Sequence, residues 1–183
     1  MMNARRSFYC ALLLQKILMW GPTVGVILVT DRKCSGRRAH VTDWCSSKIH
    51  RVVKSTLAAE AASASYAYDR ACYVRVALAE MIHGWNATWT QLLDKIPGRC
   101  VTDCKPFVDM CRKEGSMPTE RRIALDVADL RERLEAGDEL MWTDTRLMLA
   151  DPLTKRMPDQ DFLENTLREC NYIYECKSEV KVN

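Results

Sequence analysis

The sequence predicts a mixed α/β domain in which one sheet is flanked by helices, and three observations lead to this fold class. Residues 23–30 (TVGVILVT) form a β-branched run of strand length, and residues 40–53 contain further strand-like positions. Residues 56–82 form a helical pattern that no Gly or Pro interrupts. The rest of the chain alternates short strand-like runs with helical ones, which is typical of a sheet with helices packed on it.

The chain has the length of one domain with short appendages. Its 183 residues can bury one substantial core, and 48% apolar with 28% charged residues is the composition of a folded protein. We expect a divergent N-terminal segment at 1–22, the domain itself at 23–156, and a C-terminal helix and tail at 157–183.

Residues 1–22 fit this pattern least well. Residues 8–20 are apolar except for Gln15 and Lys16, and they follow a basic start that faintly resembles a signal peptide. The apolar run is too short to cross a bilayer, so we expect no membrane partner. We expect a core-facing helix or strand, or else sequence that is foreign to the domain.

The first two predicted strands form an antiparallel hairpin. The strand at 23–30 ends in the polar turn 31–36, and residues 40–46 and 48–53 supply the second strand and its continuation. A short, Gly-containing connection between two strands favours antiparallel pairing.

The long helix begins at Ser55 or Thr56, because either hydroxyl can accept a backbone N–H of the first turn, and Gly84 is a natural stop. Glu60 lies one turn inside it, between alanines that look fit for burial. A buried carboxylate there would need a partner or a metal ion. The alternative is a solvated first-turn Glu that the helix dipole favours.

The second half of the chain predicts shorter elements. In order, these are a helical piece at 85–95, a strand at 99–103, a helix at 105–114, a helix ended by Gly137, a strand at 139–143 and a helix at 159–170. In the helix before Gly137, Ile123, Val127, Leu130 and Leu134 form an apolar stripe at helical spacing.

Charge is distributed unevenly along the chain. Residues 1–55 hold ten Lys and Arg against two acids, about +8, whereas the remainder is about −5 and the whole chain is +3. Such a split suits a surface that binds a polyanion beside an acidic centre, although it also suits a solvated face.

The cysteines do not form a recognisable framework. There are nine of them, with no CxxC pair and no zinc-finger spacing to a His: Cys10, Cys34, Cys45, Cys72, Cys100, Cys104, Cys111, Cys170 and Cys176. An odd, irregular set favours free, mostly buried thiols in a reducing compartment, so we expect an intracellular protein, cytoplasmic or nuclear.

Acids lie at or near three junctions between predicted elements. Glu60 opens the long helix, Asp103 ends a strand, and Asp151 follows the last strand. Carboxylates at neighbouring strand ends can converge at one edge of a sheet, where Mg²⁺ would neutralise them and two such ions could cleave a phosphodiester. The alternative is three unrelated surface acids.

Five motifs occur in the order of one known family. They are residues 44–48 (WCSSK), 55–60 (STLAAE), 101–103 (VTD), 118–122 (PTERR) followed by 123–130, and 149–155 (LADPLTK). Residues 23–156 thereby resemble the ribonuclease H domain at the C-terminal end of copia-type (Pseudoviridae) retrotransposon polyproteins, which follows the reverse transcriptase.

The resemblance implies a ribonuclease H-like fold that cleaves the RNA strand of an RNA–DNA hybrid with two Mg²⁺ ions. Glu60, Asp103 and Asp151 would be the catalytic metal ligands. The upstream reverse transcriptase region would be a partner within the parent polyprotein. A basic run would contact the hybrid backbone, or else be an ordinary basic hairpin surface: Arg32, Lys33, Arg37, Arg38, Lys48, Arg51 and Lys54.

One departure from the family affects both fold and activity. The family places its first metal-bridging Asp on the opening, central strand, but residues 1–30 contain no Asp or Glu, and Asp31 lies at the far end of the following strand. The opening strand is therefore either replaced by residues 8–20 or missing, and the chain looks truncated at its N-terminus. We expect weak or absent nuclease activity. The alternative function is a non-catalytic nucleic-acid-binding or protein-interaction module on the same scaffold.

Overall fold

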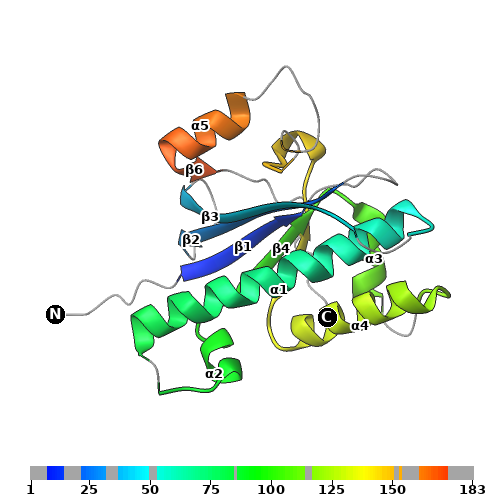
Figure 1. Ribbon diagram of the computed structural model, residues 1–183, viewed down its shortest axis with the longest axis horizontal. Coiled ribbons are helices and arrows are strands. Elements are labelled where there is room, and N and C mark those ends of the chain that lie inside the picture. Colours follow the sequence, from blue (N-terminus) through cyan, green and yellow to red (C-terminus); the bar gives the residue numbers. More distant parts are fainter. Residues whose placement is uncertain are drawn as a thin grey trace.

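A mixed, six-stranded sheet is the centre of the fold. The computed structural model describes residues 8–14, 22–31, 37–49, 53–84, 86–113, 117–150, 153 and 161–172. The strand order is β5-β4-β1-β2-β3-β6 (Figure 1). The strands are β1 (Phe8–Leu14), β2 (Pro22–Asp31), β3 (Arg37–Lys48), β4 (Gly98–Thr102), β5 (Glu139–Trp142) and β6 (Asn171–Tyr172). β1 pairs antiparallel with β2 and parallel with β4, β4 pairs parallel with β5, and β3 pairs antiparallel with β2 and β6.

Helices cover both faces of this sheet. They are α1 (Thr56–His83), α2 (Trp89–Leu93), α3 (Lys105–Arg112), α4 (Arg121–Glu135), the short 3₁₀ helix η1 (Thr145–Leu147) and α5 (Asp161–Glu169). α1, α2 and α4 lie on one side, and α5 lies on the other (Figure 1). The predicted class, a mixed sheet flanked by helices, is confirmed. Among the described helices, none has the length and apolar character that crossing a bilayer requires.

The central strand comes from the N-terminal segment. Leu12 of β1 is paired with Ile27 of β2 on one side and with Cys100 of β4 on the other. Of the two alternatives, replacement of the opening strand is therefore the one observed, and the strand that replaces it is Phe8–Leu14. An apolar strand suits this place because both faces of a central strand are covered.

Neighbouring residues of the strands alternate between two apolar clusters. Ile27 and Cys100 belong to the cluster beneath α1, whereas Val26 and Val101 belong to the cluster on the opposite face. This alternation follows from the pleat, which sends successive side chains to opposite faces. The second cluster also contains three consecutive buried residues, Met148 to Ala150, and the buried Tyr172 of β6.

The bounds of α1 agree with the sequence prediction. The Ala58 N–H donates to Ser55 Oγ at 3.1 Å, so Ser55 is the N-cap, and Gly84 ends the helix with a φ of 88°. The face of α1 toward the sheet is built mainly of alanines. Small side chains let the helix backbone approach the strands closely.

A buried ion pair links α1 to the sheet. Arg75, which is 4% exposed, donates to both carboxylate oxygens of Asp138 at 2.8 and 2.9 Å and to the Ile96 carbonyl at 2.7 Å. Asp138 Oδ1 also accepts the Gly98 N–H at 2.7 Å. A Cβ at Gly98 would lie 2.7 Å from Arg75 Nη1, so only glycine leaves room for this pair.

Candidate metal and nucleic-acid site

Two of the three acids predicted from the sequence, Glu60 and Asp103, lie on elements that meet at one edge of the sheet. β1, β4 and β5 are parallel, so their carboxyl ends meet at the same edge. β3 runs in the same direction because it is antiparallel to β2. α1 begins and α3 lies at this end of the sheet (Figure 1). We call it the carboxyl edge.

Glu60 is a buried residue of α1. Its exposed fraction is 2%, and Ala58, Ala59 and Ala61 around it are buried as well. The interpretation of Glu60 as a solvated first-turn residue is therefore wrong, because the alanine-rich face of α1 packs on the sheet and carries Glu60 with it. Burial, Cys111 and Glu60 all raise the pKa of the Cys100 thiol, with burial first, so Glu60 lies close to β4.

Asp103 directly follows β4 and is half-buried. Its backbone carbonyl accepts a hydrogen bond from Trp142 Nε1 at 3.0 Å, and its Oδ2 accepts one from Thr145 Oγ1 at 2.8 Å. Its other carboxylate oxygen, Oδ1, is buried and accepts no hydrogen bond from the described part of the chain. Such an oxygen is suited to a cation or a water molecule.

Asp151 lies outside the described residues, so its prediction stays untested. Ala150, which precedes it, is fully buried, and the Leu147 carbonyl a few residues earlier accepts the Tyr172 hydroxyl at 2.6 Å. The chain that leads to Asp151 is thus anchored on the sheet face opposite α1.

The carboxyl edge receives no carboxylate from β1. Leu14, the last residue of β1, is level with Thr102 of β4, and every residue of Phe8–Leu14 is uncharged. Asp31 is paired with Phe8 at the opposite end of β1. The expected position of Asp31 at the far end of its strand is confirmed, and the length of the strand separates it from Asp103.

The donor chemistry at this edge fits a hard cation, but the described set is small. Glu60 and Asp103 supply carboxylate oxygens, which are the ligands that Mg²⁺ prefers. Within the described residues, no group of three or more His, Cys, Asp or Glu side chains could hold a metal ion. A site with three carboxylate ligands would need a residue outside the described ones, and Asp151 is the residue that the sequence analysis predicts.

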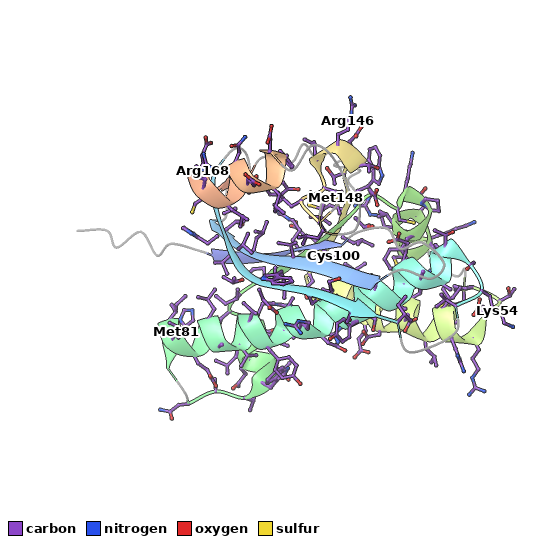
Figure 2. All side chains as sticks on the ribbon, turned by 45° about the horizontal axis from the view of Figure 1, so that its top comes forward. Lys54, Met81, Cys100, Arg146, Met148 and Arg168 are labelled. Carbon is purple, nitrogen blue, oxygen red and sulfur yellow. The ribbon has the colours of Figure 1, made fainter. Side chains whose placement is uncertain are left out.

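The predicted basic residues do not form one compact patch. Lys48 ends β3 at the carboxyl edge, and the exposed Lys54 precedes α1, at the end where Figure 2 labels it. Arg37 and Arg38 lie at the other end of the 12-residue β3, where they pair with β6. At about 3.3 Å per residue, the two ends are about 35 Å apart. Arg32, Lys33 and Arg51 lie outside the described residues.

No family model matches the chain, and no curated protein matches it in sequence. Solved structures similar to it include LC11-RNase H1, isolated from compost by a metagenomic approach, with a TM-score of 0.49 and 13% identity over 88% of this chain and 99% of that one. They also include the N-terminal RNase H domain of Rv2228c from Mycobacterium tuberculosis, solved as a fusion with maltose-binding protein, with a TM-score of 0.48 and 15% identity over 89% of this chain and 99% of that one. Both are ribonucleases H.

Two residues that contact Asp103 were missed by the sequence reasoning. Trp142 and Thr145 are 39 and 42 residues away from it in the chain. No local spacing could indicate them, because the parallel pairing of β4 with β5 brings them to Asp103.

Proposed function

We propose that the chain is a ribonuclease H-like domain of the copia-type retrotransposon kind, which binds RNA–DNA hybrids and has a divalent-metal site at the carboxyl edge. The observation that carries the proposal is the burial of Glu60 at the start of α1, at the edge where Asp103 follows β4. The two acids belong to separate sequence motifs. If Glu60 and Asp103 share a chemical role, they must lie at the same edge of the sheet.

Glu60, Asp103 and Asp151 would hold Mg²⁺. Bound there, the metal would activate a water molecule and stabilise the leaving oxygen of an RNA phosphodiester. The chain's own residues keep the acids in place: α1 buries Glu60 against the sheet, and residues after β5 hold Asp103. The buried Asp103 Oδ1 supports the assignment, since carboxylate oxygens are metal ligands.

Cleavage by this chain is expected to be slow or absent. The uncharged β1 cannot supply the carboxylate that would bridge two ions, so their mutual repulsion is less compensated. This observation favours the second candidate function, a non-catalytic module on the same scaffold. Such a module would bind nucleic acid or a protein partner.

The hybrid backbone would contact the basic residues at the carboxyl edge first. Lys48 ends β3 and Lys54 precedes α1 at this edge, whereas Arg37 and Arg38 lie at the other end of β3 and could reach only a distant part of a long duplex. Arg32, Lys33 and Arg51 complete the proposed set. The reverse transcriptase region of a parent polyprotein remains the proposed partner upstream.

The first test measures binding and cleavage of a fluorescent RNA–DNA hybrid with Mg²⁺. We expect the wild type to bind with an affinity that falls steeply with salt, and Lys54→Ala to lower the slope of that dependence by about one unit. Glu60→Gln should abolish any residual cleavage and keep binding. Glu135→Gln, at an exposed Glu that ends α4, is the control. A chain that does not bind the hybrid at low salt would refute the proposal.

A second test restores the missing carboxylate. Leu14 is level with Thr102, and Gln15 follows Leu14 as Asp103 follows Thr102, so Gln15→Asp adds an acid next to the end of β1. We expect Mg²⁺-dependent cleavage of the RNA strand to rise at least about tenfold, because a bridging ligand compensates the repulsion between two ions. Gln15→Asn is the matched control. If Gln15→Asp folds, binds the hybrid and cleaves no faster than Gln15→Asn, the non-catalytic module is favoured.

A further inference from the structure

One short segment holds Asp103 at both its backbone and its side chain. Trp142, the last residue of β5, donates its indole N–H to the Asp103 carbonyl at 3.0 Å. Thr145, the first residue of η1, donates its hydroxyl to Asp103 Oδ2 at 2.8 Å. The carboxylate is therefore held in one orientation by residues of the neighbouring strand end.

The two carboxylate oxygens of Asp103 differ in their contacts. Oδ2 is occupied by the Thr145 hydroxyl, whereas Oδ1 is buried and accepts no hydrogen bond from the described residues. A hydroxyl donated to one oxygen fixes the rotamer and leaves the other oxygen to ligate a cation. Hydrogen-bonding partners of this kind commonly determine how well a carboxylate binds its metal.

The Thr145 hydroxyl is not needed to build η1. The cap of η1 is Asp144, whose Oδ1 accepts the Arg146 N–H at 3.0 Å. The segment beyond η1 is held by the burial of Met148 to Ala150, and Figure 2 shows Met148 above the sheet. Thr145 itself is exposed. Its hydroxyl thus serves Asp103 rather than the local fold.

We propose that Thr145, together with the indole N–H of Trp142, is a positioning residue that orients the Asp103 carboxylate toward a divalent cation. This inference rests on the proposed function, since it assumes that Asp103 is a metal ligand. It adds a hydroxyl and an indole to a site that the sequence motifs assign to carboxylates alone.

The test measures Mn²⁺ affinity of the full chain by titration of the free-ion EPR signal, with Mg²⁺ competition. Thr145→Val keeps the shape of the side chain and removes the hydroxyl, so we expect the affinity to fall about tenfold. Thr145→Ser should restore it. Trp142→Phe replaces the indole by a smaller aromatic ring without the N–H, and should weaken binding in the same direction. Thr119→Val, at an exposed threonine before α4, is the control.

Melting of the metal-free variants separates positioning from a structural role. A positioning role predicts that Thr145→Val melts as the wild type does without metal and loses only the shift that Mn²⁺ produces. A lowered metal-free melting temperature with unchanged Mn²⁺ affinity would overturn the inference.

Asp103→Asn separates this inference from the proposed function. If Asp103→Asn abolishes Mn²⁺ binding and Thr145→Val leaves it unchanged, the positioning role is wrong and the metal site stands. If neither Asp103→Asn nor Glu60→Gln changes Mn²⁺ binding, the metal site and the positioning role both fall.

Discussion

Glu60 combines an ionisable side chain with almost complete burial. It is 2% exposed, and the side chains of Ala58, Ala59 and Ala61 beside it contain no polar atom. An ionised carboxylate at such a depth requires donors or a cation from elsewhere in the fold. The alanines allow α1 to lie close to β4, and the same closeness takes Glu60 out of water. The close packing of α1 on β4 is therefore also what buries the Glu60 carboxylate.

The buried thiols of Cys100 and Cys111 lead to a prediction about chemical reactivity. Burial and neighbouring groups raise the pKa of Cys111 to about 12 and raise that of Cys100 further. Because the thiolate is the nucleophile, both should resist iodoacetamide at pH 8 in the native state, whereas the less buried Cys104 and Cys170 should react before them. Mass spectrometry of the alkylated peptides checks this order.

The raised thiol pKa values also give a direction for stability. The thiols ionise near pH 8.5 in the unfolded chain and stay protonated in the fold, so unfolding releases protons at alkaline pH. Stability should therefore fall as the pH rises above about 8.5.

Fast alkylation of Cys100 in a chain that is folded by circular dichroism would contradict the described core.

At the scale of elements, two ion pairs one residue apart differ in burial. Asp138 is paired with the buried Arg75 of α1, whereas Glu139 is paired with Arg99 of β4 and is 45% exposed in its side chain. Leaving a buried charge without its partner is far more costly than losing a surface pair.

Asp138→Asn should therefore destabilise the fold by about 3–5 kcal/mol, because it leaves the Arg75 guanidinium buried and uncompensated. Glu139→Gln is the matched control, with an expected loss below about 1 kcal/mol. Urea unfolding of both variants measures the difference. Equal midpoints for the two would show that Arg75 does not depend on Asp138.

At the scale of the whole molecule, β1 joins the two halves of the sheet. It lies between the antiparallel strands β2 and β3 and the parallel strands β4 and β5, and α1 crosses the same sheet beneath it (Figure 1). Without β1, the inner edges of β2 and β4 would lose their backbone partners, and unpaired strand edges favour aggregation.

Deletion of residues 1–21 should consequently prevent folding. We expect the shortened chain to be insoluble or to lack a cooperative thermal transition, since it loses the strand that pairs with both Ile27 and Cys100. Deletion of residues 1–6, which precede β1, is the control. A cooperative transition at the wild-type temperature in the longer deletion would mean that Phe8–Leu14 is dispensable.

Sequence reasoning recovered most elements because their signals are local. The Ser55 cap, the Gly84 stop and the buried stripe of Ile123, Val127 and Leu130 depend on residues within a few turns of one another. The burial of Glu60 could not be decided in this way, because its helix dipole favours a solvated acid and its alanine neighbours favour a core. Contact with the sheet decided it.

The sequence by itself determined the class of the fold, the hairpin, the long helix and the absence of an acid from residues 1–30. Only the tertiary structure decided that Phe8–Leu14 is the central strand, and that Trp142 and Thr145 hold Asp103. Local propensities depend on neighbouring residues, whereas strand order and register depend on contacts between residues that are dozens of positions apart.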